Sequence, residues 1–161
     1  MSGRSANDPI ADVEVAWEGQ AMQSANNILA AAISGRSCRV DKREGDWLFS
    51  FGEGLHIAVA APWRIVTSIG IAYGHEDDGH KFGLPEPVNG ELLANEFLDE
   101  RTVISVEVEP QTADLSVIFD SGARIDIFNN SSGYEGWVAN VRTGERAITI
   151  VALGGGSLWI Q

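Results

Sequence analysis

Cysteine is nearly absent from this chain of 161 residues, because Cys38 is the only one. A single cysteine cannot form an intramolecular disulfide, and it cannot build a cysteine-based zinc site. Apolar runs are short as well: no stretch approaches the roughly 20 residues of a membrane-spanning helix, and the first residues lack the apolar segment of a signal peptide. We therefore predict a cytoplasmic protein without a membrane partner.

Basic residues are scarce. The chain has 11 Lys and Arg against 23 Asp and Glu, which gives a formal net charge of −12. The negative electrostatic field of this charge repels the phosphate backbone of nucleic acids, so the sequence predicts no nucleic-acid partner. A basic protein surface or a cation is the partner that this charge favours.

Recognisable catalytic motifs are lacking. The three histidines have no known motif around them, and Ser131 and Ser132 lack the Gly-x-Ser-x-Gly pattern that exposes a serine nucleophile. The glycines at 154–156 lack the Lys-Ser/Thr of a P-loop and are interpreted as a turn. No cofactor is predicted, and a non-enzymatic protein is favoured over an enzyme.

Hydrophobic spacing predicts a helix followed by a three-stranded meander. Apolar residues recur at helical spacing from Glu18 to Ser34, and Gly35 follows where a helix ends. Over residues 37–59 the period changes to two, and the segments KREGD and GEG supply two turns. Residues 1–16, small and polar at their start, are predicted to form a loosely ordered tail.

The second half repeats this order. Leu92, Leu93 and Phe97 predict one apolar face of a shorter helix that Asn89 caps, and a second meander is predicted over residues 103–128. A shift of the chain by 68 positions aligns DWLFSFGEGLHIAV with DLSVIFDSGARIDI, and a Trp-led strand follows each segment. This pattern predicts an internal duplication with approximate two-fold pseudosymmetry.

The predicted fold class is α+β. Two antiparallel β-meanders form a sandwich or a partly closed barrel, with one longer and one shorter helix. A single domain is predicted over residues 17–161, made of two similar halves at about 17–84 and 85–161, because the chain is long enough for one buried core. The sequence leaves open whether the protein is a monomer or a homodimer.

The loop between the halves, YGHEDDGHKFGLPEPV, is the most polar interruption of the pattern. His75, Asp77, Asp78 and His80 have the nitrogen and oxygen donors that a divalent metal takes, but a solvated connector explains the same residues. Phe82 and Leu84 are expected to pin the loop to the body of the protein.

The stretch FNNSSGYEGW, residues 128–137, also has two interpretations. Asn, Ser and Gly can simply turn the backbone, with Gly133 and Gly136 at positive φ and Tyr134 and Trp137 as anchors. The same polar groups make a surface suited to recognition. The predicted partner-binding residues are Asn130, Ser131, Tyr134, Glu135 and Trp137.

KFGLPEPV with the short helix after it, and TADLSVIFDSGARIDIFNNSSGYEGW, resemble a family of small uncharacterised bacterial domains, some of them similar to immunity proteins of toxin systems. The resemblance covers roughly residues 35–160. It implies a bacterial origin and a role in binding another protein, and it carries over no catalytic residue.

Taken together, these observations predict a non-enzymatic cytosolic protein-binding module, for which an immunity protein that neutralises a bacterial toxin domain is the leading form. The alternative is a small-molecule or metal-dependent enzyme with its site at residues 74–83.

Overall fold

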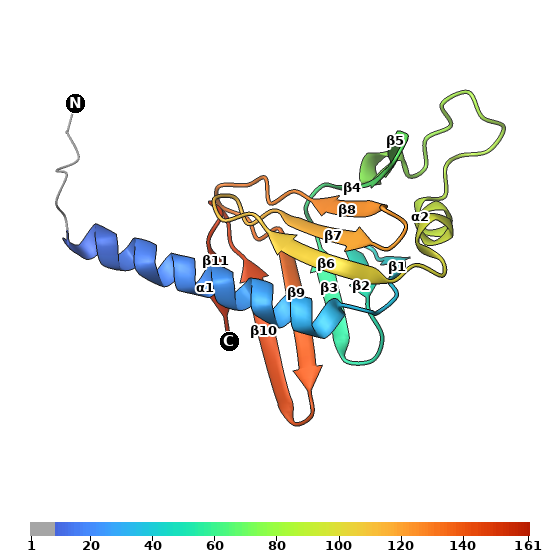
Figure 1. The fold of residues 1–161 in the computed structure, drawn as a ribbon. Coiled ribbons are helices and arrows are strands. Elements are labelled where there is room, and N and C mark those ends of the chain that lie inside the picture. Colours follow the sequence, from blue (N-terminus) through green and yellow to red (C-terminus); the bar gives the residue numbers. More distant parts are fainter. Residues whose placement is uncertain (1–8) are drawn as a thin grey trace, which may run out of the picture.

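The computed structural model describes residues 9–161, with side chains described from Gly19 onward. Within these residues two α-helices accompany two antiparallel sheets (Figure 1). The elements are α1 (Pro9–Ile33), β1 (Arg39–Lys42), β2 (Trp47–Ser50), β3 (Leu55–Val59), β4 (Trp63–Thr67), β5 (Gly70–Gly74), the 3-10 turn η1 (His75–Asp77), α2 (Gly90–Leu98), β6 (Val103–Val108), β7 (Leu115–Phe119), β8 (Arg124–Ile127), β9 (Trp137–Thr143), β10 (Arg146–Ala152) and β11 (Leu158–Ile160). The predicted α+β sandwich is confirmed, and the sheets do not close into a barrel.

The long helix α1 begins at Pro9 rather than at Glu18. Proline suits the first turn of a helix, because its fixed φ is helical and its missing N–H would have no partner there. Residues 9–16 of the predicted tail thus belong to α1, and residues 1–8 lie outside the described residues. The apolar stripe predicted further along the helix is buried: Met22, Ala25, Leu29 and Ile33.

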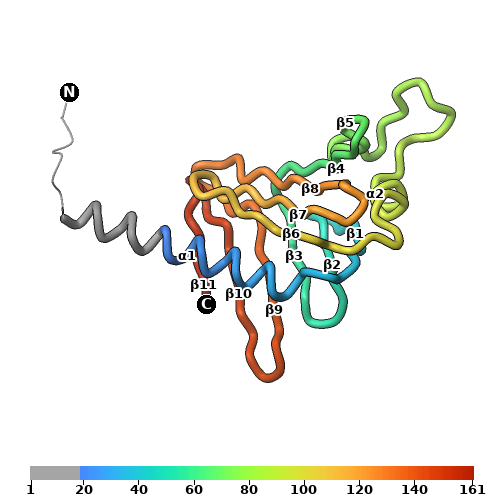
Figure 2. The backbone as a smooth tube through the Cα atoms, in the orientation of Figure 1, coloured from blue at the N-terminus to red at the C-terminus, as the bar shows by residue number. Residues whose placement is uncertain are grey.

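Each sheet is built from both halves of the chain. The six-stranded sheet has the order β1-β2-β3-β9-β10-β11, and the five-stranded sheet has the order β5-β4-β8-β7-β6. After each meander the chain crosses to the opposite sheet, so β4 pairs with β8 and β9 pairs with β3 (Figure 2). One hydrophobic cluster between the sheets includes side chains from both halves.

The predicted pseudosymmetry is present in the strand register. The hairpins β2–β3 and β7–β8 have the same pairing when the chain is shifted by the 68 positions seen in the sequence. The matching pairs are Trp47↔Val59 with Leu115↔Ile127, Phe49↔Ile57 with Val117↔Ile125, and Ser50↔His56 with Ile118↔Arg124. Residues 46–59 and 114–127 therefore share one local topology.

The helices also follow this symmetry, because each closes a side of the sandwich where two sheet edges meet. α1 packs against β6 and β11, whereas α2 packs against β1 and β5. Asn26 of α1 accepts a hydrogen bond from the Val108 amide at 2.9 Å, and Asn95 of α2 accepts one from the Val40 amide at 2.9 Å. One edge strand of each sheet, β1 and β6, thus has an amide paired with a helix side chain, which hinders pairing with another chain.

The apolar face of α2 matches the prediction in part, because Leu93 and Phe97 pack against the core. Asn89 caps the helix as expected, because its side chain accepts from the Leu92 amide at 3.0 Å. Leu92 itself, however, is exposed, whereas Ala94 and Leu98 are fully buried. Spacing alone could not distinguish these faces, because apolar residues lie on both sides of this short helix.

Candidate functional site

The two crossovers between sheets differ in length, and this difference locates the candidate site. Three residues, 60–62, join β3 to β4, whereas nine residues, 128–136, join β8 to β9. The crossovers are otherwise equivalent: the Ala60 amide donates to the Gly136 carbonyl at 3.1 Å, and the Phe128 amide donates to the Pro62 carbonyl at 2.9 Å. The fold can therefore make this connection with six fewer residues than the second half uses.

The base of the β8–β9 loop is fixed by Asn129, which is only 7% exposed. Its amide nitrogen Nδ2 donates to the carbonyls of Thr112 and Leu153, both at 2.9 Å, and its backbone N–H donates to Asp114 at 2.8 Å. The side-chain oxygen Oδ1 is buried and has no hydrogen-bond partner. Sequence patterns did not single out Asn129, although the unequal spacing of Trp63 and Trp137 from the two hairpins was a signal that the loop is an insertion.

The loop needs glycine for close packing and not, as predicted, for positive φ. Neither Gly133 nor Gly136 is among the residues with positive φ. A Cβ on Gly136 would instead lie 2.4 Å from Asn129 Oδ1, and a Cβ on Gly154 would lie 2.5 Å from the Gly133 backbone. The glycine turn at 154–156 therefore packs directly against this loop, and the Gly155 amide donates to the Ser131 carbonyl at 2.8 Å.

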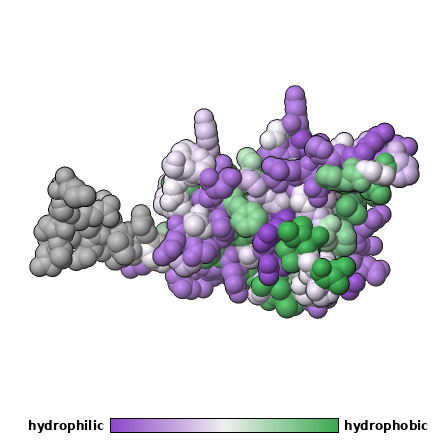
Figure 3. Space-filling model, turned by 90° about the horizontal axis from the view of Figure 1, so that it is seen from above, coloured by the Kyte–Doolittle hydropathy of each residue, from purple (hydrophilic) through white to green (hydrophobic). Residues whose placement is uncertain are grey.

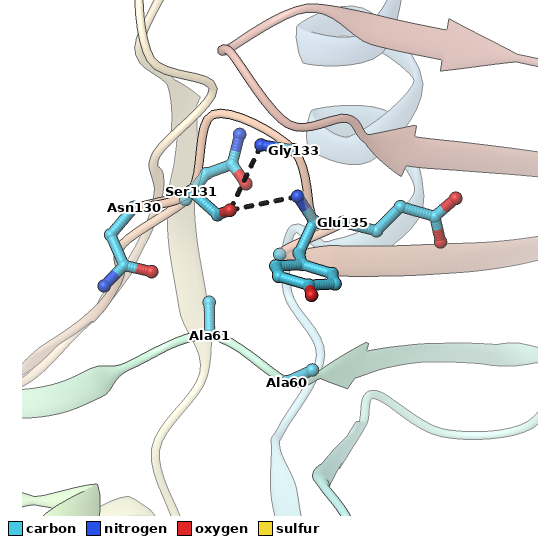
Figure 4. Close-up of a pocket in the computed structure, with 9 residues that line it drawn as sticks. Ala60, Ala61, Asn130, Ser131, Gly133 and Glu135 are labelled. Atoms are coloured by element: carbon cyan, nitrogen blue, oxygen red, sulfur yellow. Dashed lines mark hydrogen bonds between the residues drawn. The ribbon is translucent and has the colours of Figure 1, made fainter.

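A hollow of about 720 Å³ lies between this loop and the short crossover. Ala60 and Ala61 face Ser131 and Gly133 across it (Figure 4). The hydroxyl of Ser131 accepts hydrogen bonds from the Gly133 amide at 3.2 Å and the Tyr134 amide at 2.9 Å, which hold the turn. Four of the predicted residues line this hollow: Asn130, Ser131, Tyr134 and Glu135.

Tyr134 in the loop and Trp137, the first residue of β9, behave differently, although the sequence predicted the same anchoring role for both. Trp137 is 1% exposed, and its indole N–H donates to the Ala113 carbonyl at 2.8 Å. Tyr134 is 83% exposed. The anchoring role predicted for Tyr134 is wrong, and Trp137 lies beneath the loop, where it supports the surface without forming part of it.

An ion-pair cluster adjoins the start of the loop on the outer face of the five-stranded sheet. The carboxylate of Asp126, which is buried, accepts from Arg64 Nε at 3.0 Å and from Arg124 Nε at 2.6 Å. Burial alone would raise the pKa of Asp126, but these hydrogen bonds hold it below its usual value. Arg64 also lies over the Phe128 ring, 5.0 Å from its centroid, so the loop begins at a fixed position.

The predicted metal-binding residues do not come together. His75 accepts from the Trp63 amide at 3.3 Å, Asp77 accepts from the Gly74 amide at 2.9 Å, and Asp78 pairs with Lys42 and the Gly90 amide. His80 stacks on Phe82. In the part of the chain that the structure describes, no three His, Cys, Asp or Glu side chains gather as metal ligands. The proposed metal-dependent enzyme gains no support from this geometry.

The single cysteine, Cys38, is buried. Burial raises the pKa of the Cys38 thiol well above its usual range, and the nearby Asp41 carboxylate adds to the effect. A protonated, enclosed thiol is a poor nucleophile, so Cys38 serves as a small core residue.

Comparisons of the chain with protein-family models, curated proteins and solved structures found no match. The resemblance to small bacterial domains therefore stays a prediction. No helix within the described residues is long and apolar enough to cross a membrane.

Proposed function

We propose that this protein is a binding protein whose recognition surface is the β8–β9 loop, residues 128–136, together with Ala60 and Ala61. The observation that carries the proposal is the length of this loop, because the equivalent crossover needs only three residues. Six additional residues, in a loop that includes an exposed tyrosine, add little to the core. Loops that a rigid scaffold positions are the usual place for recognition.

The composition of the loop supports this role. Asn, Ser, Gly and Tyr are the residues enriched in antibody-combining loops, since Tyr offers a large contact area with few rotatable bonds and the small polar residues adapt their hydrogen bonds. Tyr134 lies beside a hollow whose wall includes Ala60 and Ala61. An apolar or aromatic side chain of a partner fits between these groups.

The charge of the protein selects the partner. A net charge of −12 attracts basic surfaces and accelerates their association. Glu135 is exposed at the edge of the loop. We infer a protein partner with a basic surface, and an immunity protein that neutralises a basic toxin domain in the bacterial cytoplasm is the specific form that we propose.

The test is retention of a partner from a lysate of the source organism. Immobilised wild-type protein is compared with the variant Tyr134→Ser and with the control Ser121→Ala, which changes an exposed residue in the turn between β7 and β8. We expect one protein that wild type and control retain and Tyr134→Ser loses, with retention weakening as salt rises. Equal retention by all three, or no retained protein, would contradict the proposal.

A further inference from the structure

A second loop, residues 79–88, extends away from the body of the protein between η1 and α2 (Figures 1 and 2). Its tip carries two large apolar side chains: Phe82 is 69% exposed and Leu84 is 55% exposed. The expectation that they pin the loop to the body is therefore wrong. Hydrophobic side chains gather at this end of the molecular surface (Figure 3).

Hydrogen bonds fix the base of this loop. The Gly79 amide donates to the Val88 carbonyl and the Val88 amide donates to the His80 carbonyl, both at 2.8 Å. Asp78, just before the loop, pairs with Lys42 of β1 and accepts from the Gly90 amide of α2. The tip is thus held at a set distance from the sheets, which lowers the ordering entropy that binding must overcome.

The tip itself is a tight turn of an unusual kind. The Leu84 amide donates to the Lys81 carbonyl at 2.7 Å, and the two residues between them have positive φ, 44° at Phe82 and 79° at Gly83. This is the pattern of a type I′ turn, whose first central position favours Asn, Asp or Gly. A phenylalanine there costs backbone stability.

Phe82 therefore contributes little that the fold needs. Its neighbour in space is the His80 ring, stacked with centroids 5.6 Å apart, and both residues are exposed. The local backbone disfavours this residue, and its side chain lies outside the core. A contact with another molecule accounts for a large apolar group in this position, as aromatic anchors do in protein interfaces.

We propose that loop 79–88 is a second protein-binding element, which inserts Phe82 and Leu84 into an apolar pocket with a basic rim on a partner protein. The loop carries one exposed lysine, Lys81, beside the exposed acids Glu86 in the loop and Glu76 in η1, so the net charge of −12 and the local acidic excess select such a rim. The same charge opposes an anionic membrane surface, so a protein is favoured over a lipid bilayer. This element is independent of the β8–β9 loop.

The first experiment separates a structural role from a binding role. The variant Phe82→Asn installs a residue that the turn favours, so the melting temperature should stay unchanged or rise. The matched control is Ile104→Thr, which removes another exposed apolar side chain, from β6. A melting temperature that falls by several degrees for Phe82→Asn alone would show that Phe82 supports the fold, and it would overturn the proposal.

The second experiment identifies the occupant. A photo-crosslinking phenylalanine replaces Phe82 in the full chain, and Ile104 in a control, and cells of the source organism are irradiated. We expect a discrete heterologous adduct from position 82 alone. The crosslinked protein, identified by mass spectrometry and purified, should bind Phe82→Asn at least tenfold more weakly than wild type and Ile104→Thr equally well.

Three results would overturn this assignment. They are the absence of an adduct specific to position 82, an adduct with a second copy of this chain, and Phe82-dependent binding to vesicles of phosphatidylserine and phosphatidylcholine. Tyr134→Ser is measured with the same partner, so that failure of loop 79–88 and failure of the β8–β9 loop are told apart.

Discussion

Tyr134 in the β8–β9 loop and Trp137 at the start of β9 lie three positions apart, and their truncation should differ greatly in its effect on stability. Trp137 is 1% exposed, and Trp137→Ala removes its packing and leaves the Ala113 carbonyl without its hydrogen bond. Truncation of a buried tryptophan costs about 3–5 kcal/mol, and the unpaired carbonyl puts this site in the upper part of that range. Tyr134→Ala removes an exposed ring and should change stability by less than about 0.5 kcal/mol.

Thermal and urea unfolding of both variants measure this contrast. For a protein of this size each kcal/mol moves the melting temperature by roughly 2–4 °C, so a loss of about 4–5 kcal/mol in Trp137→Ala should lower it by roughly 8–20 °C. The melting temperature of Tyr134→Ala should stay within about 2 °C of wild type. A comparable loss for both variants would show that the loop packs as one structural unit, and it would refute the separation of anchor from recognition surface.

Three further predictions concern the scaffold around the site. Asn26→Ala and Asn95→Ala should each lower the free energy of unfolding by about 1–3 kcal/mol, because each leaves an edge-strand amide unpaired. Urea unfolding that finds no loss of stability for either variant would contradict the contacts between the helices and the edge strands. Gly136→Ala should be clearly destabilising, because the new Cβ would meet Asn129. Gly133→Ala should melt close to wild type, because no atom lies within 4 Å of its Cβ. Equal melting temperatures for the two variants would refute the close packing at Gly136. The pKa of Asp126 is lowered in the folded protein, so the ionised carboxylate stabilises the fold above about pH 4, and this stabilisation is lost as the pH falls through the folded-state pKa. The difference in free energy of unfolding between wild type and Asp126→Asn should therefore narrow in acid. A difference that is constant from pH 6 to pH 2 would contradict the stabilising role of the carboxylate.

Local patterns predicted the meanders well. The alternation over residues 37–59, with turns at KREGD and GEG, predicted three strands, and the apolar residues on the predicted inward side, such as Trp47, Phe49 and Phe51, are buried. The 68-residue shift likewise predicted the matching registers of the two hairpins. These features depend on neighbours along the chain, so the sequence contains enough information to specify them.

The crossing of strands between sheets could not be predicted in the same way. A Trp-led strand after each meander is equally compatible with its own sheet and with the opposite one, because pairing partners are chosen by contacts far apart in sequence. Only the structure shows β4 beside β8 and β9 beside β3. The consequence for function is that two equivalent crossovers exist, one short and one long.

The exposure of side chains in loops was the other feature that the sequence could not predict. Phe82, Leu84 and Tyr134 were expected to anchor their loops because large apolar groups usually lie inside. All three are exposed, whereas the polar Asn129 is buried at the base of the loop. These inversions of the usual pattern mark both proposed binding elements, and a pattern based on average burial cannot reveal them.

The most direct test of the central claim is the affinity of the purified partner for wild-type protein and for Tyr134→Ser, measured by calorimetry at two salt concentrations. We expect Tyr134→Ser, with an unchanged melting temperature, to bind at least about tenfold more weakly, as is usual for an aromatic at the centre of an interface, and salt to weaken binding of the wild type. Equal affinity for the two proteins would contradict the assignment of the β8–β9 loop as the recognition surface.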